Sequence, residues 1–321
     1  MVRHLYYDKY MEMIKTTHLT KNFGNIRAVG DLSFSVFKGE IFGLVGPDGA
    51  GKTTTMRLLT SIMEPTSGNA WVVGHHVVKE SEIIKEKIGY MSQKFGLYPD
   101  LTVIENINFY ADIYGIPRKE REKETDNLLA FSNLRPFKKR LAGNLSGGMK
   151  QKLGLVCALI HTPRVLFLDE PTNGVDPVSR RDFWRILYGL LHKNVTIFVS
   201  TAYLDEAERC NRVGLIHKGR LLACGTPDEV KKLMHGTILE IHSSEPRKAL
   251  AILREELHAD SLGIFGASIH LVTQNPEKSM VQVEKLLRKA DLKLSGMRVI
   301  KPTLEDVFVS VLVKDKGVQQ S

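Results

Sequence analysis

Long hydrophobic runs are absent from this sequence of 321 residues, and cysteine is scarce. The longest clean apolar stretch, residues 153–160, is far shorter than the roughly 18 residues that span a bilayer. Charged residues interrupt the apolar ones throughout residues 1–15, so no secretory leader is indicated. The three cysteines form no C-x-x-C spacing, which argues against a disulfide framework and a zinc site. These absences predict a cytosolic chain whose thiols are reduced and mostly buried.

Glycine (26 residues) and proline (12 residues) are too few for a fibrous or low-complexity protein. With 43% hydrophobic and 25% charged residues, the composition is that of an ordinary globular protein. The unusual global number is the net charge of +9, from 45 Lys+Arg and 36 Asp+Glu. Such an excess indicates a polyanionic partner, which could be nucleic acid, an anionic membrane face or nucleotide phosphates.

Short β-type runs alternate with helical patterns between residue 16 and about residue 230, as in α/β proteins. Several runs are continuously apolar, which is typical of strands covered on both faces of a parallel sheet. The predicted strands are residues 32–37, 41–45, 88–91, 165–168, 196–199 and 212–216. The β pattern lapses after residue 95, where charged helical sequence predicts a helical insertion over about residues 95–148.

A second, smaller unit follows a plausible boundary near residues 225–236. It has a predicted strand at residues 238–241 and three predicted helices, with no chemical motif. The apolar positions of the first two helices are Leu250, Leu253 and Leu257, then Met280, Val283, Leu287 and Ala290. Thr303 and Asp306 resemble an N-capping pair for the last helix, which carries Leu304, Val307, Phe308 and Val311. We therefore predict a tail at 1–12, a large domain at 13–230 and a small α/β domain at 231–321.

The strongest motif is a phosphate loop. Residues 46–53 read Gly-Pro-Asp-Gly-Ala-Gly-Lys-Thr and match G-x-x-x-x-G-K-[ST] between a predicted strand and a predicted helix. Glycines let backbone N–H groups point inward, and the helix N-terminus adds partial positive charge at the phosphates. Lys52 can reach the β- and γ-phosphates, and the Thr53 hydroxyl can ligate Mg²⁺.

A carboxylate pair, Asp169 and Glu170, ends the predicted strand at residues 165–168. Side chains alternate faces along a strand, so the two carboxylates can take different tasks. We expect Asp169 on the magnesium side and Glu170 toward an attacking water. After a phosphate loop, such a pair indicates the hydrolytic half of an ATPase.

A second anion site is suggested where residues 145–148, Leu-Ser-Gly-Gly, precede a helical run at residues 149–160. Ser146 is a favourable N-cap, and Gly147 and Gly148 leave the helix N-terminus open to a closely approaching anion.

The chain continues with Gly-Val-Asp at residues 174–176. Together, and in this order along the chain, these motifs resemble those of the ATP-binding subunit of ABC transporters, and the resemblance covers about residues 13–230. The resemblance implies an α/β fold: a P-loop NTPase core with a mainly parallel sheet, an antiparallel β portion and the helical insertion. The small C-terminal α/β domain is similar to the accessory domain of exporter-type members that serve drug, antibiotic or polysaccharide efflux. Residues 302–308, Pro-Thr-Leu-Glu-Asp-Val-Phe, carry that second resemblance.

The resemblance also implies roles for individual residues. The expected ATP-binding residues are Phe23, Gly46, Pro47, Asp48, Gly49, Ala50, Gly51, Lys52, Thr53, Thr54 and Gln93, with Phe23 stacking on adenine. Magnesium is expected on Thr53, Gln93 and Asp169, and Gln93 also senses the attacking water. Glu170 is the expected general base, and Asp176 signals across a dimer. Two subunits meet head to tail, so that Ser146, Gly147 and Gly148 close over ATP in the partner's phosphate loop.

Three positions depart from the family pattern. Ala202 stands where members usually carry a histidine that contacts the γ-phosphate and holds the water. Met149 replaces a glutamine, and Asp48 replaces an asparagine and adds negative charge near the phosphates. Because alanine has no side-chain donor or acceptor, we predict that nucleotide binding survives while turnover is reduced. Such a subunit would suit an asymmetric pair, unless Tyr203 or Thr201 substitutes for the missing group.

The expected cofactors are ATP and Mg²⁺, and the expected partners are a membrane permease and a second ATP-binding subunit, identical or different. The resemblance therefore predicts a subunit bound through the permease to the inner face of the cell membrane, powering export. Two alternatives stay open: an ABC-type ATPase that acts outside transport, and a regulatory subunit with little turnover. No nucleic-acid partner is expected, because the basic clusters are short and lack interleaved aromatics; they are residues 138–140, 180–181 and 231–232.

Overall fold

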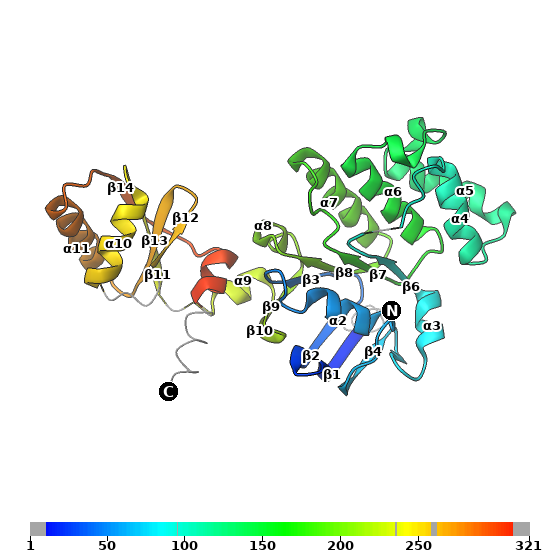
Figure 1. Ribbon diagram of the computed structural model, residues 1–321, viewed down its shortest axis with the longest axis horizontal. Helices are drawn as coiled ribbons and strands as arrows, with labels where there is room; N and C mark the ends of the chain where they lie inside the picture. Colours follow the sequence, from blue (N-terminus) through cyan, green and yellow to red (C-terminus); the bar gives the residue numbers. More distant parts are fainter. Residues whose placement is uncertain (1–10, 95, 235, 258–261, 311–321) are drawn as a thin grey trace, which may run out of the picture. The chain divides into compact units, whose positions relative to one another are not determined.

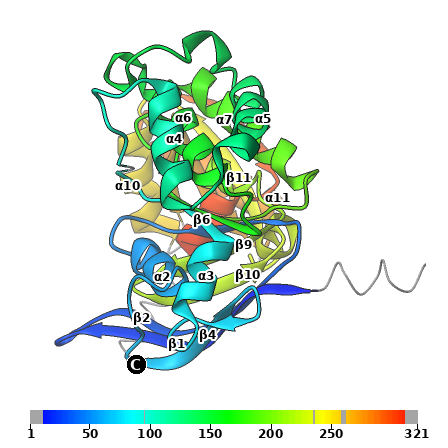
Figure 2. The same cartoon turned by 90° about the vertical axis from the view of Figure 1, so that its right-hand side faces the viewer.

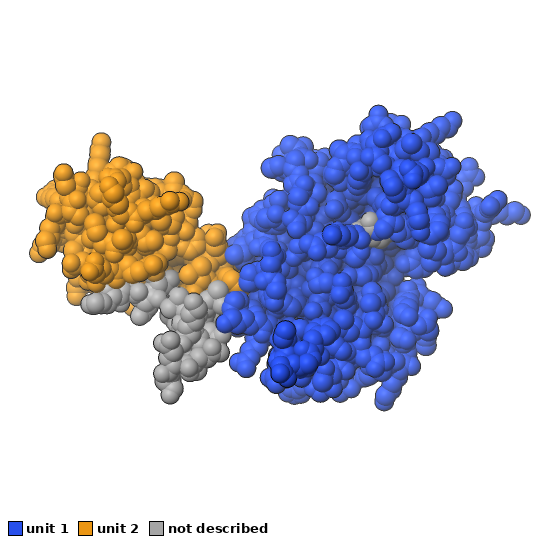
Figure 3. Space-filling view, in the orientation of Figure 1, with its two compact units in different colours: residues 1–224 blue, residues 225–321 orange. Residues whose placement is uncertain are grey.

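The chain forms two compact units, residues 1–224 and 225–321, which are described separately (Figure 3). The computed structural model describes residues 11–94, 96–234, 236–257 and 262–310. Most of the expected N-terminal tail and Val311 of the last expected helix therefore lie outside the described residues. Among the described residues, no helix combines the length and the apolar character needed to cross a membrane.

A six-stranded sheet forms the centre of the first unit, in the order β10-β9-β3-β8-β7-β6 (Figure 1). Its strands are β3 (Ile41–Val45), β6 (Ile88–Met91), β7 (Val165–Asp169), β8 (Thr196–Thr201), β9 (Arg212–His217) and β10 (Arg220–Gly225). The pairs among β6, β7, β8, β3 and β9 are all parallel. Every residue of β3, β7 and β8 is buried. The predicted mainly parallel sheet is confirmed, and β3 and β6 have the predicted bounds.

A second sheet is antiparallel and has the order β2-β1-β4-β5. It consists of β1 (Glu12–Phe23), β2 (Ile26–Phe37), β4 (Ser67–Val72) and β5 (His75–His76), and it is the antiparallel portion that the resemblance implied. Sequence patterns identified only the second half of β2. The register between β1 and β2 shifts at several points, so β1 alternates irregularly and β2 alternates regularly only in its second half.

Helices cover both faces of the central sheet. Helix α2 (Lys52–Leu59) lies between the two sheets, where Met56, Leu58 and Leu59 join one buried core with residues of both sheets (Figures 1 and 2). The other face carries α6 (Gly147–Leu159) and α7 (Pro177–Leu191), and α4 (Val103–Ile113) packs on α6. Further helices of this unit are α3 (Ser81–Lys87), α5 (Arg118–Phe131) and α8 (Leu204–Ala207), with 3₁₀ turns η1 (Arg135–Phe137) and η2 (Ala142–Asn144), while α9 (Pro227–Lys231) belongs to the second unit.

One predicted helix is shorter than expected. The helix after the phosphate loop was expected to reach residue 63, but α2 ends at Leu59. The Thr60 hydroxyl donates to the Met56 carbonyl at 2.9 Å, and Ser61 has a φ of 58°. A side chain that satisfies a terminal carbonyl and a left-handed residue directly after it end the helix.

The cysteines follow the expectation for two positions of three. Cys157 and Cys210 are buried, whereas Cys224 is exposed. Burial raises the pKa of both buried thiols well above the ordinary range, so neither is a nucleophile near neutral pH.

The second unit has the order β-α-β-β-α-β: β11 (Thr237–Ser243), α10 (Pro246–Leu257), β12 (Leu262–Phe265), β13 (Ser268–Thr273), α11 (Pro276–Lys289) and β14 (Leu294–Ile300). Its antiparallel sheet has the strand order β12-β13-β11-β14, which is a split βαβ arrangement. Residues 304–310 are helical, and Thr303 and Asp306 cap this helix reciprocally through backbone N–H groups. The predicted capping pair is confirmed.

Candidate functional site

The phosphate loop connects β3 to α2 at the carboxyl edge of the central sheet. A Cβ on Gly46 would lie 2.1 Å from the Ile216 carbonyl oxygen, and one on Gly51 would lie 2.5 Å from that of Ala28. Gly51 also has a φ of 104° and occupies the N-cap of α2. Because no side chain fits at these two points, the backbone can bring the open N-terminus of α2 close to a bound phosphate.

Lys52 is the charged centre of the loop. Its side chain is buried, and Nζ donates to the carbonyl oxygens of Gly46 at 2.7 Å and Pro47 at 3.0 Å. Nζ also lies 3.1 Å from Oε1 of Glu170. The Asp48 carboxylate is 4.0 Å from Nζ, but its side chain is 95% exposed. Water therefore screens the added negative charge at residue 48, which limits its effect on a bound phosphate.

Asp169 and Thr53 form an oxygen-rich corner beside this lysine. The Thr53 hydroxyl donates to Asp169 Oδ1 at 3.2 Å, and the Ser200 hydroxyl donates to the same oxygen at 2.6 Å. Asp169 Oδ2 is buried and has no hydrogen-bond partner among the described residues. A buried carboxylate oxygen without a partner is costly unless a cation or donor can reach it. Mg²⁺ prefers oxygen ligands, so these residues fit the metal.

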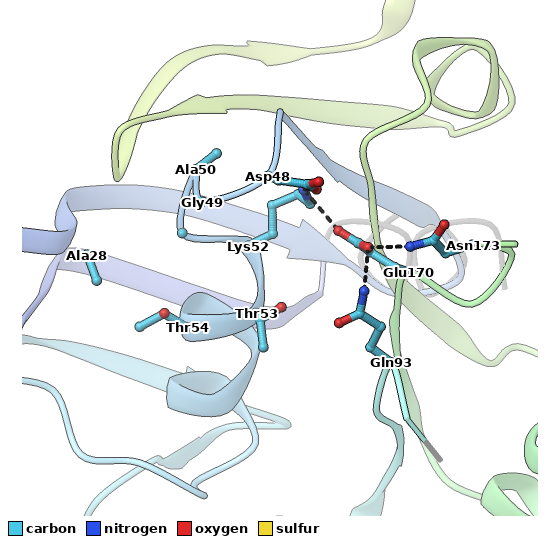
Figure 4. Close-up of a pocket in the computed structure, with 11 residues that line it drawn as sticks. Ala28, Asp48, Gly49, Ala50, Lys52, Thr53, Thr54, Gln93, Glu170 and Asn173 are labelled. Carbon is cyan, nitrogen blue, oxygen red and sulfur yellow. Dashed lines mark hydrogen bonds and ion pairs between the residues drawn. The ribbon is translucent and has the colours of Figure 1, made fainter.

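Glu170 receives donors from three directions (Figure 4). Lys52 contacts Oε1, while the side-chain amides of Gln93 and Asn173 donate to Oε2 at 2.9 and 3.3 Å. The Glu170 backbone has a φ of 48°, and its N–H donates to the Ser200 hydroxyl at 3.0 Å. A non-glycine residue in this conformation is uncommon and is maintained by its surroundings. The fold thus fixes where this carboxylate points.

A cavity of about 320 Å³ lies among these side chains. Its lining residues are Ala28, Asp48, Gly49, Ala50, Gly51, Lys52, Thr53, Thr54, Gln93, Glu170 and Asn173. Gly46 and Pro47 are not among these residues, but their carbonyl oxygens accept from Lys52 Nζ. Phe23, at the end of β1, does not line the cavity, and its ring is 46% exposed with Lys21 Nζ 5.4 Å from its centre.

The residues expected to reach a partner's ATP do not line this cavity either. Ser146 caps α6 by accepting from the Met149 N–H at 3.3 Å, and Asp176 caps α7 by accepting from the Val178 and Ser179 N–H groups. These backbone donors at α7 lower the pKa of Asp176. A Cβ on Gly148 would lie 2.5 Å from Ser179 Cβ, so the two capped helix ends pack directly together.

Ala202, which stands where family members usually carry a histidine, is exposed, and its side chain is only a methyl group. Of the two possible substitutes, Thr201 faces the interior, where its hydroxyl donates to buried Glu206 at 2.8 Å. Tyr203 instead approaches the cavity, with its hydroxyl 3.4 Å from Asn173 Oδ1. Of these two residues, Tyr203 is therefore the one that contacts Asn173, a neighbour of Glu170.

Three residues near the site were not singled out from the sequence: Ala28, Asn173 and Ser200. Ser200 contacts Asp169 and Glu170 because the parallel register places it opposite Asp169. Asn173 follows Glu170 by three residues in a turn, with its N–H donating to the Glu170 carbonyl at 3.1 Å. Neither belongs to a spacing pattern with its own chemical meaning, so only the pairing of β7 and β8 could have identified Ser200.

Comparison with known proteins relates the chain to ATP-binding proteins of transporters. The family model described as ABC transporter matches residues 29–173. The probable multidrug ABC transporter ATP-binding protein YbhF of Escherichia coli K12 is 42% identical over 287 residues, covering 89% of this chain and 49% of YbhF. The chain thus spans about half the length of that relative. The bacitracin transport ATP-binding protein BcrA of Bacillus licheniformis is 36% identical over 309 residues, covering 94% of this chain and 97% of BcrA.

Solved structures give the same relation for the first unit. An ATP-binding subunit of an ABC transporter has a TM-score of 0.63 and 30% identity, covering 69% of this chain and 92% of that subunit. A dimeric ATP-binding cassette bound to ADP and phosphate has a TM-score of 0.61 and 25% identity, covering 67% of this chain and 98% of the cassette.

Proposed function

Because the chain belongs to the family of ABC transporter ATP-binding proteins, we propose that it binds ATP with Mg²⁺ and hydrolyses it. The observation that carries this proposal is the buried Oδ2 of Asp169, which lacks a hydrogen-bond partner in the part of the chain that the structure describes and lies beside the Thr53 hydroxyl and the phosphate loop. Thr53, Asp169 and Gln93 would hold Mg²⁺, which neutralises phosphate charge when bound. Gly46–Thr54 would hold the phosphates, and Phe23 the adenine.

In the proposed reaction, Lys52 donates to a phosphate and Glu170 accepts a proton from water. A phosphate that accepts from Lys52 Nζ competes with Glu170 Oε1 for the same ammonium group, now 3.1 Å away. Release of that contact frees the carboxylate to accept a proton from the attacking water. Asn173 still donates to Oε2, so the carboxylate keeps its orientation while Oε1 takes the proton.

We also infer that two such subunits pair and act on a membrane permease. Ser146, Gly147 and Gly148 lie away from their own cavity and would contact ATP in the partner's phosphate loop, with Asp176 beside them signalling across the dimer. The names of the relatives support export of a drug or antibiotic. In this proposal residues 13–230 form the ATP-binding domain, residues 231–321 form an accessory domain, and the permease holds the subunit at the inner face of the membrane.

Phosphate release by the purified chain tests the function. Wild type should bind a non-hydrolysable ATP analogue and release phosphate from ATP, and removal of Mg²⁺ with EDTA should abolish release. Failure to bind the analogue at millimolar concentration would contradict the proposal. In cells, a multi-spanning membrane protein should co-purify, whereas ribosomes or DNA in its place would favour the non-transport alternative.

Ala202 supports reduced turnover and hence the asymmetric pair. We expect Ala202→His to raise kcat by about tenfold, because an imidazole at residue 202 restores the donor that family members usually carry for the γ-phosphate and the water. The affinity for ATP should change little, since the phosphate loop is untouched. Steady-state phosphate release measures both constants. An unchanged kcat would mean that the missing imidazole does not limit the rate.

A further inference from the structure

We propose that Asn173 is a positioning residue for Glu170, and that Tyr203 and Arg180 hold Asn173 in its working orientation. This inference rests on the proposed ATPase function and concerns the same cavity. Figure 4 shows Asn173 directed at Glu170 from the side opposite the phosphate loop. The donor is Asn173 Nδ2, 3.3 Å from Glu170 Oε2.

Asn173 differs in kind from the other two donors to Glu170. Lys52 belongs to the phosphate loop and Gln93 to the expected magnesium site, so in the proposed function both side chains would contact Mg-ATP and share or give up their contacts to the carboxylate. Within the described part of the chain, Asn173 makes no hydrogen bond or ion pair to the phosphate loop or to Asp169, and it lies in the same tight turn as Glu170. Its contact to Oε2 can therefore persist when ATP is bound.

An exposed amide needs a second contact to keep one orientation, because its terminal torsion is broad. Tyr203 supplies that contact: its hydroxyl, which can donate, lies 3.4 Å from Asn173 Oδ1. A donor facing Oδ1 turns Nδ2 toward the carboxylate. The Tyr203 hydroxyl therefore orients the Asn173 amide so that Nδ2, and not Oδ1, faces Glu170.

The position of the Tyr203 ring is in turn stabilised by Arg180. The Arg180 guanidinium lies over its ring, 4.3 Å from the centroid, and Arg180 Nε is 3.6 Å from Glu206 Oε1. A cation over a tyrosine face is attractive, and more so where water is partly excluded. Arg180 thus links the ring to a carboxylate in the interior of the unit.

Buried Glu206 ties together the two loops that carry Asn173 and Tyr203. It accepts from Thr172 Oγ1 at 2.5 Å and from Thr201 Oγ1 at 2.8 Å. Thr172 directly precedes Asn173, and Thr201 Oγ1 accepts from the Tyr203 N–H at 3.0 Å. This buried group therefore helps to fix the spacing between the two loops, and with it the contact from Tyr203 to Asn173.

Asn173→Asp separates a positioning role from a structural one. Aspartate has the shape of asparagine and still accepts from Tyr203, but it cannot donate to Glu170 and its negative charge repels Oε2. We expect kcat for ATP to fall by about tenfold or more while KM and the affinity for a non-hydrolysable analogue change by less than about twofold. The thermal midpoint should stay near that of wild type.

Tyr203→Phe should lower kcat by about threefold, and the double variant should be no slower than Asn173→Asp, because Tyr203 acts through Asn173. Tyr188→Phe is the matched control: it removes a hydroxyl that donates to the Arg209 carbonyl at 3.1 Å, outside the cavity lining, and should leave kcat unchanged.

Several results would overturn the inference: an unchanged kcat in Asn173→Asp, parallel losses in kcat, affinity and thermal midpoint, or strictly multiplicative effects of the two substitutions. Wild type that binds the analogue without turning over ATP would overturn it too, since Glu170 would then have no reaction to serve. Failure of wild type to bind the analogue would instead refute the proposed function as a whole.

Discussion

Glu170→Gln is expected to lower kcat for ATP by about 10²–10⁴-fold, because an amide cannot accept the proton of the attacking water. The substitution keeps the side-chain shape and can still accept from Asn173 or Gln93, so the fold should survive. The affinity for Mg-ATP should be retained or rise, since Lys52 no longer has a carboxylate at 3.1 Å competing with the phosphates. Single-turnover phosphate release and equilibrium binding of ATP measure the two effects separately.

Glu82→Gln is the matched control for this substitution. Glu82 lies on α3 with its side chain 80% exposed and pairs with Lys85 at 2.7 Å, so its amide variant should hydrolyse ATP as wild type does. Because ATP persists in Glu170→Gln, paired subunits should also stay together longer, which light scattering with ATP can detect. Hydrolysis at the wild-type rate by Glu170→Gln would remove Glu170 as the general base.

Lys52→Ala is expected to weaken Mg-ATP binding by about 10²–10³-fold, because it deletes a buried ammonium group aimed at the phosphates. The same substitution removes the hydrogen bonds from Lys52 Nζ to the carbonyl oxygens of Gly46 and Pro47, so the loop also loses two internal contacts. Calorimetric titration with a non-hydrolysable ATP analogue measures the loss directly.

The control for this loss is Lys85→Ala, which removes the same side chain from an exposed ion pair on α3. Exposed pairs contribute little, so binding of the analogue and the thermal midpoint should match wild type. The thermal midpoint of Lys52→Ala shows whether the variant is still folded. We expect it to be folded, because Glu170 keeps its two amide donors, Gln93 and Asn173. Equal affinities in the two lysine variants would exclude residues 46–53 as the ATP site.

The parallel core could be predicted from the sequence because its strands are buried on both faces. Strands β3 and β6 are unbroken apolar runs, and such runs need no partner to be recognised. Strand β1 was not recognised, although Met13, Ile14 and Leu19 in it are buried. Its polar residues alternate irregularly because bulges shift the register against both of its neighbours. Only the pairing itself defines such a strand.

The site divides in a similar way. Lys52, Thr53, Asp169 and Glu170 follow two strands of one parallel sheet, and the carboxyl ends of such strands meet at a single edge. Their proximity could therefore be inferred from the motifs. The contact between Asn173 and Tyr203 joins residues 30 positions apart. It depends on the register of β7 with β8 and on buried Glu206, and no spacing in the chain encodes either of them.

The left-handed backbone conformation of Glu170 affects how a substitution at this position would change the stability of the fold. For a residue with a Cβ, that conformation costs about 1 kcal/mol that glycine or asparagine would largely avoid. A glutamate at this position therefore costs folding stability that a glycine would keep. The proposed transfer of a proton from water to Glu170 is the task that requires a carboxylate in this conformation.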